Sequence, residues 1–487
     1  MNSSIIRYIL GNVMRMEACF LLLPCIVSLV YGEGVGLYYL GPAIVCLAFG
    51  MVMAWKKPKN YVFYLKEGCI ATSLSWIVMS LVGCMPFWIS GEIPSFTDAM
   101  FETVSGFTTT GASILTNVEA LSHTALFWRS FTHWIGGMGV LVFLLAIIPL
   151  SGGSNINLMR AESPGPSVGK LVPKMKYTAR ILYIIYFGMT ILEFIFLIIG
   201  KMPVFDSICT AVGTAGTGGF GVKNDSLGSY SPYLQWVVAI FMILFGVNFN
   251  AYYYIIYRHF KKAFKMEEVR CYFAIILIAA AIIFANILDR CVSIFDALTK
   301  SVFQVASLST GFSSTDFNLW PQICRTVLVL IMFIGACAGS TGGGIKVSRV
   351  IVLFKTMIKE LHSYIHPKSI RKVNLDGKPV EHEIVRSINV YIVTFVIIFA
   401  SSVFMVAFDG KDLVTNFTAV LTTINNMGPG LAEVGPTGNF SNFSVFSKFV
   451  FMFDMLAGRL ELFPLLILFH PSAWKDLISK RAEARKF

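Results

Sequence analysis

Charged side chains are scarce in this chain: Asp, Glu, Lys and Arg make up 14% of its 487 residues. A soluble globular protein carries roughly twice that fraction. Hydrophobic residues account for 56% of the chain, and the mean hydropathy is +0.71. Apolar runs long enough to cross about 30 Å of hydrocarbon recur along it. The composition therefore excludes a soluble enzyme and predicts a multi-pass membrane protein.

The residue spacings that mark metal, redox and nucleotide sites are also missing. The ten cysteines lie mostly within apolar runs without metal-type or redox-type spacing, and the seven histidines form no cluster. A nucleotide-binding P-loop requires Lys directly after Gly, followed by Ser or Thr. The glycine-rich segment at 338–346 departs from that pattern because Ile345 intervenes. We therefore expect no enzyme activity, no catalytic residues and no bound cofactor.

Basic residues are unevenly distributed, although the formal net charge is +12. They cluster at 56–66, 160–180, 258–270, 346–386 and 475–486. Residues 86–123, in contrast, contain no Lys or Arg. Cytoplasmic loops of membrane proteins carry an excess of Lys and Arg. This rule explains the charge without nucleic-acid binding, and it predicts cytoplasmic basic loops and an outward-facing 86–123.

One sequence unit occurs four times. It reads DAMFETVSGFTTTG at 98–111 and returns in variant form at 206–219, 296–311 and 415–428. Each copy begins with a residue suited to capping a helix, runs for about three turns, and ends in a Thr/Gly-rich tract. The four predicted caps are Asp98, Asp206, Asp296 and Thr415. Because long apolar runs flank each copy, we interpret it as a half-length helix that enters the membrane and turns back.

The predicted fold class is an all-α integral membrane protein. It has four tandem helix–half-helix–helix repeats around a pseudo-four-fold pore, plus two N-terminal helices. The predicted boundaries are 1–58 for the N-terminal pair, 59–150, 151–258 and 259–360 for repeats 1 to 3, and 361–487 for a cytoplasmic loop, repeat 4 and a basic tail. About ten spanning helices are expected. Single helices are expected at 125–150, 232–257 and 443–470, and a break at 335–346.

The tracts have the composition of an ion pathway. Main-chain carbonyls coordinate a dehydrated monovalent cation without a full charge that would trap it. Glycine gives the backbone the freedom to turn those carbonyls inward, and each half-helix directs its partial negative charge toward the membrane centre. A single tract would be better explained as a loop between helices. Four tracts on the same face of the membrane favour a pore.

Three motifs carry a resemblance to a known family: FTTTGAS at 107–113, WRSFTHWIGGMG at 128–139 and AGSTGGGIK at 338–346. Together with the fourfold repeat, they resemble the superfamily of K+ transporters that includes TrkH, KtrB and fungal Trk proteins. The two N-terminal helices resemble TrkH. The resemblance implies K+ uptake across the cell inner membrane, with K+ as the transported ion. A less selective K+/Na+ transporter, or a symporter coupled to H+ or Na+, is the alternative.

The resemblance also assigns the residues of the filter. Its glycines correspond to Gly111, Gly219, Gly311 and Gly428. The residues just before them would line the ion path: Thr109, Thr110, Thr217, Gly218, Ser309, Thr310, Asn426 and Met427.

Two partners follow from the same resemblance. The family forms homodimers and pairs with a cytosolic nucleotide-binding regulatory subunit of the TrkA type. The basic loops at 151–180, 258–270 and 346–386 are candidate docking surfaces for that subunit. The positive-inside rule alone also explains their charge.

The glycine-rich segment 335–346 interrupts a helix beneath the predicted filter. By resemblance it is an intramembrane gating loop. The implied gating residues are Gly339, Ser340, Thr341, Gly342, Gly343, Gly344 and Lys346. The alternative is a passive kink that allows close helix packing, a common use of glycine in membranes.

Arg459 is predicted near the middle of the last helix. A charge at the bilayer centre costs about 2.5–3.5 kcal/mol on insertion scales, so we expect it to face water or a partner. The matching arginine in TrkH-like proteins implies regulation of cation passage, and the alternative is a structural ion pair with Asp454 or Glu461. Five other polar residues lie in apolar runs: Glu193, Arg129, His133, Asn248 and Asn250. For these we expect interhelical hydrogen bonds.

Overall fold

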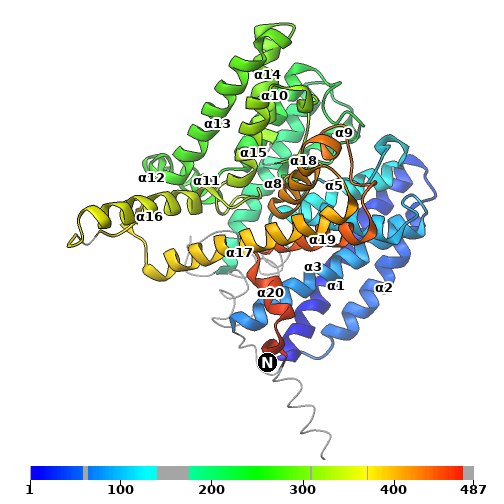
Figure 1. Cartoon of the computed structure of the whole chain (residues 1–487). Helices are drawn as coiled ribbons and strands as arrows, with labels where there is room; N and C mark the ends of the chain where they lie inside the picture. Colours follow the sequence, from blue (N-terminus) through cyan, green and yellow to red (C-terminus); the bar gives the residue numbers. More distant parts are fainter. Residues whose placement is uncertain (1, 59–63, 140–174, 308–309, 370, 475–487) are drawn as a thin grey trace, which may run out of the picture.

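The computed structural model describes residues 2–58, 64–139, 175–307, 310–369 and 371–474. Within these ranges nearly all regular secondary structure is helical (Figure 1), and one short β-hairpin is the exception. This architecture confirms the predicted fold class. The end of the helix predicted at 125–150, the loop that follows it and the basic tail lie outside the described residues.

The N-terminal pair consists of α1 (Ser3–Tyr31) and α2 (Gly36–Ala54). Gly32, with a φ of 68°, ends α1 in the left-handed conformation that glycine adopts at helix ends. The two helices cross where glycines face each other, because a Cβ on Gly50 would lie 2.8 Å from the carbonyl oxygen of Gly11.

Four repeats of helix, half-helix and return helix follow, where "return helix" denotes the helix after each half-helix. Repeat 1 comprises α3 (Leu65–Ile89), α4 (Phe96–Phe107) and α5 (His123–Gly137). Repeat 2 comprises α8 (Met175–Ile199), α9 (Val204–Ala215), α10 (Pro232–Phe245) and α11 (Phe249–Ile256). Repeat 3 comprises α13 (Glu267–Ile287), α14 (Ile294–Ser307), α15 (Gln322–Ile334) and α16 (Val347–Ile365). Repeat 4 comprises α17 (His382–Val406), α18 (Leu413–Asn425), α19 (Val445–Arg459) and α20 (Phe463–Phe469). The largest apolar core joins the N-terminal pair to repeats 1 and 4.

Two return helices that were predicted to be continuous are interrupted, which corrects both predictions. The single helix predicted at 232–257 is α10 and α11, bent by 94°. The single helix predicted at 443–470 ends at Arg459 and restarts at Phe463. The break predicted at 335–346 is confirmed, because α15 ends at Ile334 and α16 begins at Val347.

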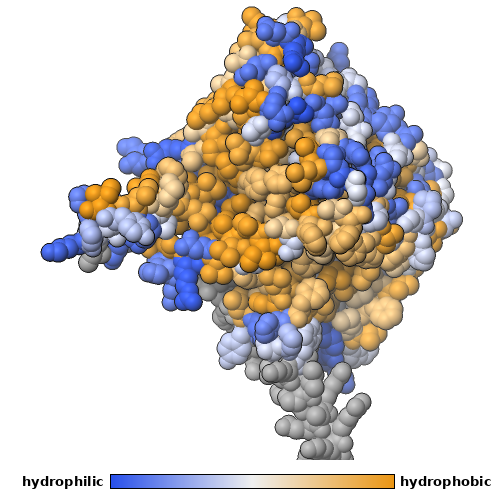
Figure 2. All heavy atoms as spheres, viewed as in Figure 1, coloured by the Kyte–Doolittle hydropathy of each residue, from blue (hydrophilic) through white to orange (hydrophobic). Residues whose placement is uncertain are grey.

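Six helices in the described ranges are long and apolar enough to cross a membrane, or seven if α10 and α11 are one bent span. The sequence predicted about ten. The return helices account for the difference, because they run for only 13–15 residues before they end. That is about 20–23 Å of helix, less than the thickness of the hydrocarbon. Figure 2 shows a broad apolar surface across the middle of the molecule, with hydrophilic residues gathered along its upper and left margins.

The predicted cytoplasmic loop at 361–383 contains regular structure. Helix α16 projects from the side of the molecule and continues to Ile365 (Figure 1). A hairpin of β1 (Asn374–Leu375) and β2 (Lys378–Pro379) follows it. Asp376 and Gly377 form its turn with φ values of 52° and 75°. Two left-handed residues in an Asp-Gly sequence give the hairpin turn whose twist matches the strands.

Candidate functional site

The half-helices begin two residues before the residues predicted to cap them. Asp98, Asp206, Asp296 and Thr415 each occupy the third position of their half-helix. In three of the four, the residue before the helix accepts a hydrogen bond from that third residue's N–H: Ser95 at 3.4 Å, Ser293 at 3.1 Å and Asp412 at 3.1 Å. In these three the predicted cap was wrong because the residue three positions earlier is also a capping type, and in the second half-helix Pro203 precedes the helix without a side-chain cap. The three aspartates still lie beside the positive end of the helix dipole.

The tracts share an unusual backbone. In the first, second and fourth, a non-glycine residue two positions before the final glycine has a positive φ: 58° at Thr109, 56° at Thr217 and 54° at Asn426. The final glycines are positive as well, from 78° to 91°. Left-handed residues at alternate positions align successive peptide groups, with the N–H groups on one side and the carbonyls on the other. Such a conformation is uncommon for threonine, so its recurrence indicates a geometry that the site requires.

The four tracts meet at their final glycines. A Cβ on Gly311 would lie 3.0 Å from the carbonyl oxygen of Gly218 and 3.2 Å from the Cα of Gly428. A Cβ on Gly219 would lie 2.5 Å from the Cα of Gly311, and one on Gly111 would lie 3.5 Å from the Cα of Gly428. The structure thus brings together the glycines that the sequence analysis assigned, around one centre.

Several side chains of the tracts point into protein. The Asn426 amide donates to the Thr110 hydroxyl and to the Met455 carbonyl, each at 2.9 Å. The Thr310 hydroxyl donates to the sulfur of Met242 at 2.5 Å, and Met427 packs in the apolar core. The side chains at these positions are therefore occupied by contacts with the surrounding protein. Ser309, also assigned to the ion path, lies outside the described residues.

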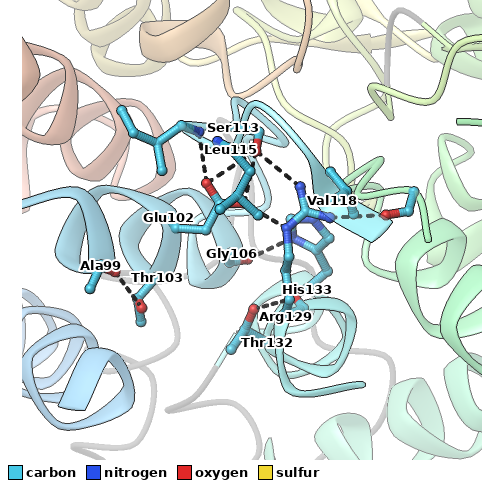
Figure 3. A network of polar contacts seen from close by, with 12 residues as sticks. Ala99, Glu102, Thr103, Gly106, Ser113, Leu115, Val118, Arg129, Thr132 and His133 are labelled. Carbon is cyan, nitrogen blue, oxygen red and sulfur yellow. Dashed lines mark hydrogen bonds and ion pairs between the residues drawn. The ribbon is translucent and has the colours of Figure 1, made fainter. Parts of the chain in front are cut away.

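A buried ion pair supports the first two tracts (Figure 3). Arg129 on α5 donates from Nε to Glu102 Oε1 on α4 at 2.6 Å, with side chains 3% and 0% exposed. The same guanidinium donates to Ser113 Oγ at 3.2 Å and to the Gly221 carbonyl at 3.0 Å. It also lies 3.6 Å from the ring centroid of Phe220. Because Ser113 and Gly221 each follow a final glycine by two residues, Arg129 holds the two tracts in register.

The Glu102 partner was missed by the sequence analysis. The two residues carry opposite charges within largely apolar segments, a signal from which their pairing could have been inferred. His133 and Asn248 also make the expected interhelical bonds: His133 Nδ1 lies 2.7 Å from the Gly106 carbonyl, and Asn248 donates to Glu268 at 3.1 Å.

Among the five polar residues in apolar runs, Asn250 and Glu193 do not make the expected interhelical hydrogen bond to the described residues. Asn250 donates its backbone N–H to Asn248 within one helix, at 2.9 Å. Glu193 is fully buried on α8, and its carboxylate oxygens make no hydrogen bond to the described residues. Thr214 lies close to that carboxylate, but its hydroxyl donates to the Thr210 carbonyl at 2.9 Å.

We predict that Arg129→Ala lowers the stability of the folded protein by about 3–5 kcal/mol, because it leaves Glu102 buried without its partner. Thermal unfolding of the purified protein in detergent measures the change. Lys300→Ala is the matched control. It breaks an ion pair with Asp296 whose side chains are each 30% exposed, and such pairs contribute at most about 1 kcal/mol. Equal destabilisation by the two variants would contradict the assignment.

The intramembrane loop, residues 335–346, lies against the C-terminal ends of other helices. Gly344 donates its N–H to the carbonyl of Asn425, the last residue of α18, at 2.8 Å. Thr341 donates from its hydroxyl to the carbonyl of Phe245, where α10 ends, at 3.2 Å. A Cβ on Gly343 would lie 2.9 Å from the Asn426 carbonyl oxygen. The loop therefore sits directly beneath the fourth tract.

Arg459 is the last residue of α19 rather than a mid-helix residue, because the backbone turns left-handed at Glu461 and Leu462. Its guanidinium donates to Thr341 O at 3.0 Å, in the intramembrane loop. It also donates to Gly136 O at 2.5 Å and Gly137 O at 2.6 Å, at the end of α5. Arg459 thus joins the loop to the end of α5.

The two ion-pair partners considered for Arg459 have other contacts. Asp454 accepts a hydrogen bond from Ser402 at 2.8 Å, and Glu461 pairs with Arg349. A second cation lies nearby, because Lys346 is 4% exposed and folds its ammonium back onto the carbonyls of Gly342 and Gly343.

Comparison with known proteins decides the family. Residues 40–476 match the TrkH family, described as a cation transport protein. This chain belongs to the TrkH family. The Trk system potassium uptake protein TrkH of Salmonella typhimurium is 34% identical over 97% of this chain and 99% of its own length. TrkH of Escherichia coli K12 is 33% identical over the same shares.

A solved structure agrees with this assignment. The crystal structure of the potassium transporter TrkH from Vibrio parahaemolyticus matches with a TM-score of 0.87 and 30% identity, covering 97% of this chain and all of that one. The TrkH resemblance predicted from the motifs is confirmed. The relatives of this TrkH-family chain are named as transport proteins and not as enzymes.

Proposed function

We propose that this protein takes up K+ across the cell inner membrane through the ring formed by its four tracts. The observation that carries the proposal is the convergence of Gly111, Gly219, Gly311 and Gly428 on one centre, with left-handed residues at alternate backbone positions. Carbonyls aligned in this way replace the hydration shell of a monovalent cation. The C-terminal ends of four half-helices add partial negative charge at the same place. The printed names of the relatives, which are potassium uptake proteins, support K+ as the ion.

The intramembrane loop is the proposed gate. Its glycines permit more than one backbone conformation, and φ is positive at Gly335, Gly339 and Gly344. It is packed against the fourth tract, and Arg459 and Lys346 place two positive charges on its carbonyls. A cation that leaves the ring meets the loop and these charges. Withdrawal of the loop would remove both obstacles.

The proposed orientation in the membrane rests on the distribution of charge. The proposed homodimer rests on one exposed apolar surface. The positive-inside rule places the basic loops at 258–270 and 346–386 in the cytoplasm and the tracts on the outer side. Helix α16 exposes Phe354, Met357, Ile358 and Leu361, which are 59%, 50%, 45% and 56% exposed. Their spacing forms one apolar stripe, which supports a second copy of the chain as its partner.

The same basic loops are the proposed docking surface for a regulatory partner. A cytosolic nucleotide-binding subunit of the TrkA type would dock on them. The third candidate loop, 151–180, lies mostly outside the described residues. Because α16 continues directly from the intramembrane loop, a partner bound there could move the gate.

Flux into liposomes that contain the purified protein tests the proposal. We expect K+ and Rb+ to enter faster than Na+ and Li+ at equal concentration, and empty liposomes are the control. Equal uptake of all four ions would favour the less selective K+/Na+ transporter. Uptake that requires a gradient of H+ or Na+ would favour the ion-coupled symporter.

A further inference from the structure

Glu268 holds both ends of the intramembrane loop. It lies in the first turn of α13 and is 5% exposed. Its Oε1 accepts the backbone N–H of Ala338, near the start of the loop, at 2.6 Å. The same oxygen accepts the backbone N–H of Ser348, just beyond the end of the loop, at 3.2 Å. A single carboxylate oxygen therefore fixes how far apart the two ends lie.

Asn248 completes the arrangement from the break between α10 and α11. Its amide nitrogen donates to Glu268 Oε2 at 3.1 Å, and its amide oxygen accepts the N–H of Asn250 at 2.9 Å. The neighbouring Phe249 donates its N–H to the Gly339 carbonyl of the loop at 3.0 Å. The loop is thus attached to repeats 2 and 3 by buried hydrogen bonds, several of them to a charged group, which makes them the stronger kind.

The same turn of α13 is attached to the cytoplasmic hairpin. Glu267 pairs with Lys355 of α16 at 2.5 Å, and Lys355 also donates to the Asn374 carbonyl of the hairpin at 2.8 Å. The hairpin's Asp376 accepts the backbone N–H of Glu267 at 2.6 Å. A displacement of the exposed hairpin therefore acts on the residue next to Glu268.

We propose that Glu268 and Asn248 hold the intramembrane loop in its closed position, and that the hairpin at Asn374–Pro379 releases it through the start of α13. Glu268 is a positioning residue, because it contacts the loop and not the ion. The inference rests on the proposed function, in which the loop is the gate.

The first part of the proposal is tested by exchanging the hydrogen-bond donor and acceptor between the side chains of Asn248 and Glu268. Asn248→Asp keeps an oxygen to cap α11 but removes the donor to Glu268. Glu268→Gln keeps one oxygen for Ala338 and Ser348 but points an amide nitrogen at the Asn248 amide. Loss of a hydrogen bond to a charged group shifts an equilibrium by about tenfold, so each single variant should raise K+ flux per folded molecule several-fold. The double variant restores a donor facing an acceptor and should return flux toward the unmodified level.

K+ flux is measured with purified protein in liposomes at pH 8. At this pH the two facing carboxyl groups of the Asn248→Asp variant share a proton less readily. Glu360→Gln is the control, because that residue is 58% exposed on α16. Single variants with unchanged flux per folded molecule would overturn the proposal. A double variant whose K+ flux exceeds that of both single variants would also overturn it. Two side chains that face each other should instead compensate for each other's substitution. If one single variant fails to fold, the other single variant and the double variant decide.

Asp376→Ala tests the hairpin. It removes the acceptor for Glu267 at an exposed position, and we expect raised flux that is not additive with Asn248→Asp. Unchanged flux would overturn the role of the hairpin. If the proposed function itself were wrong, removal of residues 339–344 would leave K+ flux unchanged. If that removal raises flux while the Glu268 and Asn248 variants do not, the loop is the gate and the proposed holding residues are wrong.

Discussion

Replacement of Gly311 or Gly111 with serine is expected to reduce the discrimination of K+ against Na+ by about tenfold or more. Both glycines have a positive φ, 91° and 78°, and a side chain at such a position costs about 1–3 kcal/mol. A Cβ on Gly311 would also press on the Gly218 carbonyl oxygen at 3.0 Å. The ring would relax by turning carbonyls away from the ion. A shift of about 1.4 kcal/mol between two ions changes their ratio tenfold.

The measurement is the ratio of K+ to Na+ flux in liposomes, normalised to folded protein. Gly188→Ser is the matched control, because Gly188 has an ordinary φ and an added Cβ would meet nothing within 4 Å. Unchanged flux ratios in both filter variants would remove these glycines from the ion pathway. A changed ratio in the control would show that the effect is not specific to the ring.

Removal of residues 339–344 is expected to raise K+ flux strongly and leave the ratio of K+ to Na+ flux as it is. The segment contains Thr341, which accepts the hydrogen bond from Arg459, and Gly343, which lies against the fourth tract. Its loss would open the space beneath the ring without touching Gly111, Gly219 or Gly311. The flux ratio serves as the internal control for an intact ring. Unchanged or abolished flux in well-folded protein would make the loop structural rather than a gate.

The repeats could be predicted from sequence because their signal is local and occurs four times. A cap, a short apolar helix and a Thr/Gly tract recur between long apolar runs, and four weak signals together became decisive. The break at 335–346 was equally visible, since glycine there is dense. The caps of the first and fourth half-helices were misplaced by three residues because Ser95 and Asp98, or Asp412 and Thr415, are both acceptable caps.

The breaks between α10 and α11 and after α19 could not be predicted, because the sequence around them carries too little local signal. Between α10 and α11 only Gly246 and Asn248 indicate a turn, and neither excludes a helix. At the end of α19 the left-handed residues are Glu461 and Leu462, which carry no such signal at all. Tertiary contacts set these conformations: Arg349 pairs with Glu461, and Glu268 receives the Asn248 amide. The buried Arg129–Glu102 pair likewise depends on residues 27 positions apart along the chain.

The four return helices end after 15, 14, 13 and 15 residues. This common length marks one level of the molecule at which all four return helices end. On one side of this level lie the half-helices and the ring of final glycines, and on the other lie segments that follow the return helices, namely the intramembrane loop, α11 and α20. A continuous helix would transmit every inner movement to the ring, whereas an interrupted helix can bend at the boundary. Under the proposed function, ion choice belongs to the ring and opening belongs to the intramembrane loop, which lie on opposite sides of this boundary.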